Sequence, residues 1–483
     1  MERRLLSDLA LSLFLNLLIK PLSILFIDAG VQKAVGNEAY GNYFVLFNIT
    51  IILNIFLDLG INNFSVRYIA QKGKNIEGFV AQIFSLKLLL FILYAFLVCG
   101  VGILMNLSTQ AFQHLCLLIL IQFIIQFIAF NRAILNGQHR FREEAIVSVT
   151  DRTILILFAG VFLLFFPEKT TIDIFIYTQL ISYIIALLLS LLLLKQTMWG
   201  TLLLVKPSLP IGILKETLPY ALLILLMLLY NRMDSVILQQ IKQDGAYQAG
   251  IYAQGFRLLD ALYMVGMIFA GMLYPVFSRM LHEMDQRLPD LIQSSAKMLI
   301  GGSFVVAFVT FLNAGHILSF IYGKTLNQDS VFVFQCLMIS FACMSVNFLF
   351  GTLLTANANL KPLIIGASVG VLSSALLNTI FIPTYGVKAC AVVSICTQAL
   401  VSSLLYFSSR KHVKIGLSVE TKHYLWLMFI GLTMFLFLLY PINASLFGFL
   451  FIVLVGFDFF ILIVFEEMNR NKDLLNPSLT IGD

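Results

Sequence analysis

Long apolar segments constrain the fold of this chain more than any other feature of its sequence. They recur from residue 8 to residue 465, are rich in Leu, Ile and Phe, and are separated by clusters of charged residues, Gly and Pro. Only 12% of the residues are charged, against roughly 25% in a soluble domain. Because a bilayer offers no water to backbone groups, segments of this length must cross it as helices. The chain is therefore predicted to be an all-α integral membrane protein.

Fourteen membrane-spanning helices are expected from these segments. The predicted spans are residues 8–30, 43–66, 79–104, 112–134, 145–166, 171–194, 217–240, 250–276, 296–321, 331–356, 362–382, 387–408, 421–440 and 443–465. Placing the amino terminus and every second loop on one side collects 21 Lys and Arg residues there and leaves 5 on the other side. Because basic loops stay in the cytoplasm, both termini are predicted to be cytoplasmic.

The net charge of +6 is explained by the same loops, since basic residues beside a membrane interact with anionic lipid head groups. The lipid bilayer is therefore the expected partner of these residues, and no nucleic acid is expected. The six cysteines all fall within predicted spans and show no C-x-x-C spacing. They are predicted to pack as small apolar residues, without a disulfide or a metal site.

A short motif occurs twice and predicts an internal duplication. Gly36-Asn-Glu-Ala-Tyr-Gly41-Asn-Tyr43 and Gly245-Ala-Tyr-Gln-Ala-Gly250-Ile-Tyr252 share the pattern G-x4-G-x-Y at an offset of 209 residues, and each opens an even-numbered span. We expect two six-helix lobes at residues 1–200 and 201–410, followed by helices 13 and 14 and a cytoplasmic tail at 411–483. Because six is even, the lobes share one orientation and are related by a pseudo-two-fold axis along the membrane normal.

Five basic residues lie inside predicted spans and indicate the chemistry of the protein. They are Lys20, Lys87, Arg152, Arg232 and Arg257. A cation at bilayer depth costs roughly 2.5 to 3.5 kcal/mol on insertion scales, so it is expected to face a water-filled path, an anion or an acidic partner. Together they predict a cavity that binds a negatively charged substrate.

Two of the five are the preferred substrate contacts, each with a structural alternative. Lys20 lies too deep in the first span to reach the cytoplasmic surface, and Pro21 loosens the helix beside it. Local pairing is its alternative. Arg257 lies two turns into the eighth span, and its alternative is an ion pair with Asp260, three residues further on the same face.

The other three have stronger alternatives. Arg232 and Asp234 are two residues apart, so they lie on different faces of the seventh helix, near its external end. A structural pair between the lobes is as good an explanation for Arg232 as substrate contact. Arg152 follows Asp151, which can neutralise it. Lys87 has no acidic neighbour in sequence. A further alternative holds for both Lys87 and Arg152, because each side chain is long enough to extend towards the cytoplasmic end of its helix.

Acidic and amide side chains within the spans have two possible roles. Asp28, Asp58, Asp234, Asp260 and Asp458 could carry protons or a coupling cation, or could neutralise the basic residues. Asp58, near the middle of the second span, is the preferred coupling candidate. The amides in the second and fourth spans line a wet lumen or hydrogen-bond between helices, which is their more common use. They include Asn48, Asn54, Asn62, Gln122 and Gln126.

Several stretches of the chain resemble a known family. Tyr40-Gly-Asn-Tyr43, Asp58-Leu-Gly-Ile61 with Arg67, Arg232-Met-Asp234-Ser-Val-Ile-Leu238, Gly250-Ile-Tyr252 and Tyr274-Pro-Val-Phe-Ser-Arg279 carry the resemblance. They resemble the polysaccharide-export branch of the multidrug/oligosaccharidyl-lipid/polysaccharide (MOP) exporter superfamily, in particular its O-antigen type flippases. The resemblance implies two lobes in a V around a central cavity. It also implies alternating access, which moves an undecaprenyl-pyrophosphate-linked oligosaccharide outward across the bacterial inner membrane.

The resemblance further implies roles for particular residues and partners. Lys20 and Arg257 fall on the first and eighth helices, which flank the lateral gate of such flippases, and are expected to hold the pyrophosphate. A polysaccharide polymerase and a chain-length regulator are the protein partners that an O-antigen, capsule or exopolysaccharide pathway would supply. No cofactor is expected, and H⁺, Na⁺ or the membrane potential is left open as the energy source.

Two other function classes were weighed against the flippase. A multidrug or small-molecule exporter of the same fold would suit a cavity lined by acids that binds organic cations, whereas the five intramembrane cations argue for an anionic substrate. A membrane glycan polymerase or glycosyltransferase typically carries a large external loop, and the predicted external loops are about four to ten residues long. No H-E-x-x-H, G-x-S-x-G or P-loop motif is present. The protein is therefore not expected to be an enzyme.

Overall fold

The computed structural model describes residues 14–72, 76–194 and 211–413. Within these ranges it contains 12 helices that are long and apolar enough to cross a membrane, and no strand. Each overlaps one of the first twelve predicted spans, so the all-α fold of a multi-pass membrane protein is confirmed. The predicted spans 421–440 and 443–465, together with Asp458, lie outside the described residues.

The first half supplies six spans. The first span, Phe14–Val35, includes the π-helical turn η1 (Ser23–Asp28) and α2 (Ala29–Val35). The others are formed by α3 (Asn37–Leu53), η2 (Asn54–Leu57), α4 (Ile61–Lys72), α5 (Glu77–Leu104), α6 (Thr109–Gly137), α7 (Phe141–Phe165), η3 (Pro167–Lys169) and α8 (Ile172–Leu193). The second span is broken between η2 and α4, where Leu59 and Gly60 have positive φ angles of 47° and 81°.

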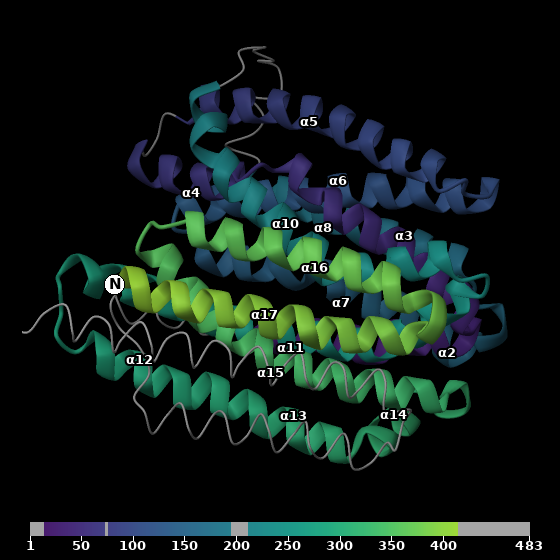
Figure 1. The fold of residues 1–483 in the computed structure, drawn as a ribbon. Coiled ribbons are helices and arrows are strands. Elements are labelled where there is room, and N and C mark those ends of the chain that lie inside the picture. Colours follow the sequence, from purple (N-terminus) through teal and green to yellow (C-terminus); the bar gives the residue numbers. More distant parts are fainter. Residues whose placement is uncertain (1–13, 73–75, 195–210, 414–483) are drawn as a thin grey trace, which may run out of the picture. The chain divides into compact units, whose positions relative to one another are not determined.

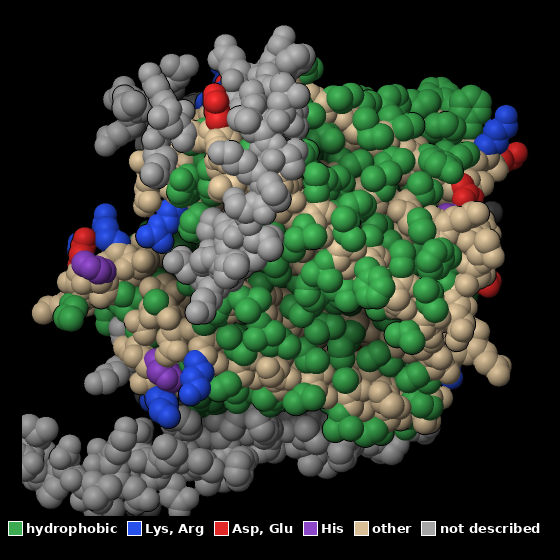
Figure 2. All heavy atoms as spheres, turned by 90° about the horizontal axis from the view of Figure 1, so that it is seen from above, with side chains coloured by type: hydrophobic (Ala, Val, Ile, Leu, Met, Phe, Trp, Pro, Cys, Tyr) green, Lys and Arg blue, Asp and Glu red, His purple; other side chains and the backbone are tan. Residues whose placement is uncertain are grey.

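The second half follows the same order. It consists of α10 (Ile211–Ile241), α11 (Gly245–His282), α12 (Leu288–Ala296), η4 (Lys297–Gly301), α13 (Gly302–Leu312), α14 (Ala314–Tyr322), η5 (Gly323–Thr325), α15 (Gln328–Ala356), α16 (Lys361–Tyr385) and α17 (Val387–Val413). The long helices run side by side (Figure 1). Hydrophobic side chains cover the middle of the face shown in Figure 2, with charged side chains at its edges, as a bilayer requires.

Equivalent helices pack in equivalent pairs, as a duplication predicts. In the first half α8 packs against α6 and α7, and α6 packs against α3 and α4. In the second half α17 packs against α15 and α16, and α15 packs against α11. The first span contacts α7 through η1, just as α10 contacts α16. The architecture of two six-helix lobes is thus visible in the packing, whereas the boundaries 1–200, 201–410 and 411–483 stay a prediction.

The two halves meet mainly through their first and second spans. α3 of the first half packs against both α10 and α11 of the second half. The closest approach of the two halves therefore involves the duplicated motifs, which open α3 and α11.

Candidate functional site

A cavity of about 240 Å³ lies beside the first span, α6 and α7. Its polar lining consists of Lys20, Arg132, Ser148, Asp151, Arg152 and Tyr183. Its apolar lining includes Ile125, Ile128 and Ala129 of α6, and Met264 of α11 is its one lining residue from the second half. Lys20 and Arg152 both line this cavity, whereas their contact with a substrate stays a prediction.

Lys20 differs from the other predicted cations in the groups that lie next to its ammonium group. Among the described residues, no hydrogen bond or ion pair to Lys20 is found. The nearest carboxylate in the cavity lining, Asp151, lies closer to Arg152, at 3.4 Å from its Nε to Oδ2. Local pairing, the structural alternative for Lys20, is not what this part of the chain shows.

Arg132 adds a third cation that sequence reasoning placed in a loop. It lies in the last two turns of α6 and donates from Nε to Oε1 of Glu144 at 2.8 Å. Among the described residues, the cavity and its immediate ion pairs therefore include three cations, Lys20, Arg132 and Arg152, against two carboxylates, Asp151 and Glu144. Its net charge is positive, which suits an anionic ligand.

Arg132 could have been found by a helical pattern. Ile125, Ala129 and Arg132 follow the i, i+4, i+7 spacing of one helix face, and all three line the cavity. Arg152 is held by a ring as well as by its acidic neighbour, since its guanidinium lies 5.9 Å from the centroid of Tyr183.

Lys87 forms a buried ion pair with Asp58 within the first half. Its Nζ lies 3.1 Å from Oδ1 of Asp58 and 5.6 Å from the ring centroid of Phe130, and the residue is 2% exposed. The alternative of a side chain extended to the cytoplasmic surface is therefore wrong. Asp58 also accepts a hydrogen bond from the backbone N–H of Asn62 at 3.1 Å, beside the break in the second span.

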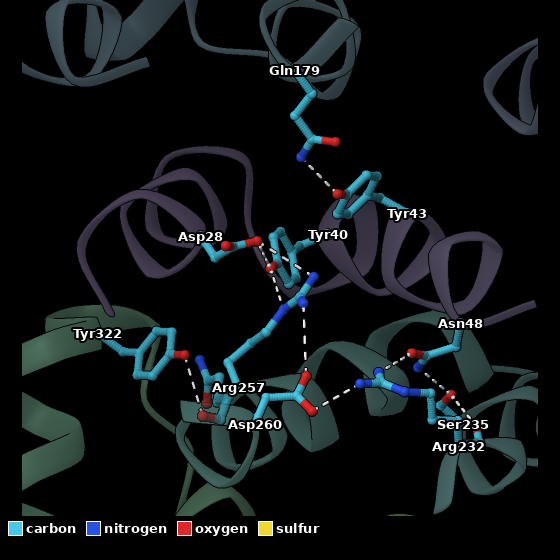
Figure 3. Close-up of polar contacts among 11 residues, drawn as sticks. Asp28, Tyr40, Tyr43, Asn48, Gln179, Arg232, Ser235, Arg257, Asp260 and Tyr322 are labelled. Atoms are coloured by element: carbon cyan, nitrogen blue, oxygen red, sulfur yellow. Dashed lines mark hydrogen bonds and ion pairs between the residues drawn. The ribbon is translucent and has the colours of Figure 1, made fainter. Parts of the chain in front are cut away.

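Arg257 lies in an ionic network between the halves (Figure 3). Its Nη2 lies 3.3 Å from Oδ1 of Asp28, and its Nε donates to the hydroxyl of Tyr40 at 3.0 Å. The predicted pair with Asp260 is present but long, at 4.0 Å. Asp28 lies eight residues beyond Lys20 on the first span, roughly 12 Å along a helix. Arg257 is not among the residues that line the cavity.

Arg232 pairs with an acid of the second half and with an amide of the first half. Its Nη2 donates to Oδ1 of Asp260 at 2.9 Å, and its Nη1 donates to Oδ1 of Asn48 at 2.9 Å. Asp260 thus stands between Arg232 and Arg257 (Figure 3). Asp234, two residues further along, points to a different face of the helix, as the sequence predicts. The expected pairing between lobes is present through Asn48.

Asp234 is a buried carboxylate with neutral partners in the described ranges. It accepts hydrogen bonds from the hydroxyl of Tyr252 at 3.1 Å, the hydroxyl of Ser374 at 2.9 Å and the amide of Asn378 at 2.7 Å. It is 2% exposed. Of the four predicted coupling carboxylates in the described chain, it is the one without a basic partner.

The amide residues of the second and fourth spans hydrogen-bond to one another. Asn54 donates to Gln122 at 2.5 Å, Gln126 donates to Asn54, and Asn62 donates to Gln126 at 3.3 Å. Interhelical hydrogen bonding, the more common use of such residues, is thus what they show.

Comparisons with known proteins match this architecture. A family model described as polysaccharide biosynthesis protein matches residues 5–281. The lipid II flippase MurJ, in an inward closed conformation, matches with a TM-score of 0.65 at 15% identity, covering 96% of this chain and 99% of its own. An inward-facing MATE family transporter of the MOP superfamily gives 0.64 at 15%, covering 84% and 98%. A MOP superfamily transporter from Pyrococcus furiosus gives 0.62 at 14%, covering 85% and 95%.

No curated protein sequence matches the chain. At 14 to 15% identity the solved structures establish the fold alone, whereas the family model spans more than half of the 483 residues. The resemblance found in the sequence is confirmed on both counts: the chain belongs to the polysaccharide biosynthesis protein family and has the fold of the MOP superfamily transporters.

Proposed function

We propose that the protein is a flippase for an undecaprenyl-pyrophosphate-linked oligosaccharide, moving it from the cytoplasmic to the outer leaflet of the bacterial inner membrane. The product would serve the assembly of O-antigen, capsule or exopolysaccharide. The observation that carries the proposal is the cavity in which Lys20 lacks a partner among the described residues while Arg132 and Arg152 lie beside it. Family membership supports the polysaccharide part of the proposal, and the fold supports transport.

The pyrophosphate is proposed to bind first at Lys20. A compact ammonium offers three donors without a fixed direction, whereas the planar guanidinium of Arg152 can contact two phosphate oxygens at once. Asp151 competes with the substrate for Arg152, and an anion of higher charge would take its place. The lipid tail would remain in the bilayer and the sugar in water.

Alternating access is supported by where the halves hold each other. The polar contacts between them involve residues 28 to 48 of the first half, including Asp28, Tyr40 and Asn48. The cavity involves the opposite part of the first span, at Lys20. With both termini placed in the cytoplasm by the basic loops, the cavity faces the cytoplasm and the contacts between halves close the outer side.

The multidrug exporter stays the second candidate, and the charge of the cavity distinguishes the two. An organic cation needs a carboxylate without a cation beside it, and the one acid among the lining residues, Asp151, lies next to Arg152. The cavity therefore favours an anionic substrate. An enzyme is not favoured, because the fold is that of solved transporters of the MOP superfamily.

The test is transport by the full-length chain in proteoliposomes that contain the lipid-linked oligosaccharide, read out by a lectin or glycosidase added outside. Lys20→Ala should lower the initial rate at limiting substrate tenfold or more, since a charged hydrogen bond contributes roughly 1.5 to 3 kcal/mol. Lys169→Ala, at the exposed turn η3, is the matched control and should transport normally. Equal rates for both variants would remove the proposed site.

A further inference from the structure

The duplicated G-x4-G-x-Y motif forms the tightest contact between the two halves. A Cβ atom added to Gly41 would collide with the carbonyl oxygen of Ala246 and lie 2.7 Å from the backbone nitrogen of Gly250. A Cβ atom added to Gly250 would collide with the carbonyl oxygen of Asn37 and lie 2.6 Å from its carbonyl carbon. Real Cβ atoms essentially never approach backbone so closely, so both positions require glycine.

The contact is self-complementary. Ala246 is the counterpart of Asn37 at the offset of 209 residues, just as Gly250 is the counterpart of Gly41. Each glycine thus packs on the residue that occupies the other motif's equivalent position, as in an interface around a two-fold axis. The motif therefore marks the point where the pseudo-two-fold axis passes between the halves.

We call the contact of Gly41 and Gly250 the twin-glycine crossing. Neutral amide side chains surround it. Gln32 donates to the carbonyl of Gly250 at 2.7 Å and to Asn37 at 3.0 Å. Gln254 donates to Asn37 at 3.2 Å. These groups are buried, and hydrogen bonds of this kind are lost as soon as the backbones separate.

Next to the crossing, the ionic network repeats the same symmetry. Asn48 of α3 reaches Arg232 of α10, and its counterpart at the 209-residue offset, Arg257 of α11, reaches Asp28 of the first span (Figure 3). In each case the second helix of one half grips the first helix of the other half. The contacts between the halves thus extend from the twin-glycine crossing to the ionic network.

We propose that the twin-glycine crossing is the gate that closes the transporter on the side away from the cavity, and that its tightness sets the balance between the closed and open states. The proposal rests on the proposed transport function. A methyl group at either glycine acts on the closed state alone, because only there do the backbones touch. It therefore shifts the population towards the state in which the halves are apart.

The gate can be tested without any substrate. Ser235 is 0% exposed and is hydrogen-bonded to Asn48 between the halves, at 2.9 Å. Ser235→Cys in the full-length protein is a reporter of opening once Cys99 and Cys116, the two cysteines that are not buried, are replaced by Ala. The measurement is its rate of labelling by a charged maleimide in nanodiscs. The same protein without Ser235→Cys gives the background.

Gly41→Ala and Gly250→Ala should each raise the labelling rate tenfold or more. Gly271→Ala on α11 and Gly100→Ala on α5 are matched controls, because a Cβ atom at either position meets nothing within 4 Å. Both controls should label as slowly as the parent. A parent-like rate in the two gate variants would overturn the proposal.

A crosslink tests the gate from the opposite direction and does not depend on the alanine variants folding. Gln239 donates to Asn42 across the halves at 2.6 Å, with Asn42 exposed and Gln239 half-buried. Asn42→Cys with Gln239→Cys, joined by a short bis-maleimide, should hold the gate closed and reduce transport at least tenfold. Transport by the crosslinked protein at the uncrosslinked rate would overturn the gate. Since labelling needs no substrate, the gate can stand even where the proposed substrate is wrong.

Discussion

The cavity in the first half and the ionic network between the halves use the same residue types in opposite ways. In the network, Arg257 and Arg232 face Asp28 and Asp260, and the charges balance. In the cavity, Lys20 has no such partner within the described chain. A cation matched by acids holds the structure together, whereas an unmatched cation destabilises it and is available to a ligand. Position inside a membrane span therefore does not by itself identify a substrate contact.

The largest effect that this comparison predicts is the loss of one network partner. Arg257→Gln leaves Asp28 buried without its cation, and breaking a buried pair on one side costs about 3 to 5 kcal/mol. We expect a large drop in thermal stability of the purified protein. The double variant Arg257→Gln with Asp28→Asn removes both charges and should recover most of the loss.

The prediction is tested by measuring the unfolding temperature of each variant in detergent, with fluorescence as the readout. Arg287→Gln, whose partner Asp285 lies in an exposed loop, is the control and should leave the unfolding temperature unchanged. If Arg257→Gln behaves like that control, the network does not hold the halves together, and the contrast with the cavity disappears.

The next largest effect has the opposite sign. Lys20→Met replaces an unmatched cation with an apolar chain of similar length, so it should stabilise the protein by about 1 to 2 kcal/mol while lowering transport at limiting substrate about tenfold or more. Functional sites commonly show this trade between stability and activity. The same unfolding assay, combined with the transport assay, checks both halves of the prediction. A destabilised Lys20→Met would mean that Lys20 has a structural partner.

A third prediction extends the comparison to a carboxylate. Like Lys20, Asp234 has no partner of opposite charge within the described chain, but it is an acid. It accepts hydrogen bonds from the neutral side chains of Tyr252, Ser374 and Asn378. Asp58, the coupling candidate preferred from the sequence, is matched by Lys87. We therefore expect Asp234→Asn to cost only about 1 kcal/mol of stability, but to remove the dependence of transport on an H⁺ or Na⁺ gradient.

The readout is transport into proteoliposomes with and without each gradient. Thr379→Val, on the exposed face of α16, is a control that leaves the gradient response intact. Retention of the full gradient response by Asp234→Asn would exclude Asp234 as the coupling group.

The sequence predicts the helices of this fold well but predicts their side-chain pairs poorly. Long apolar segments are local, so twelve spans could be placed, and the repeated motif indicated the duplication. The partner of a buried charge depends on packing between distant segments. Lys87 and Asp58 are 29 residues apart, and no spacing rule connects Arg257 to Asp28. Arg132 was missed because a cation at the end of a predicted span looks like a loop residue.

The smallest predicted effect distinguishes the roles of the cations within the cavity itself. Arg152→Lys keeps the charge but loses the planar group that faces Asp151 and the ring of Tyr183. If the pyrophosphate takes two contacts from this guanidinium, the apparent KM should rise a few-fold with kcat unchanged, because a uniform binding contact has been lost. If Arg152 only neutralises Asp151, a lysine serves as well and KM should stay constant. Arg132→Lys is the control and should have no effect on KM, because Arg132 is held by Glu144. An equal rise in KM at both positions would mean that the cavity recognises total charge, without a distinct contact at Arg152.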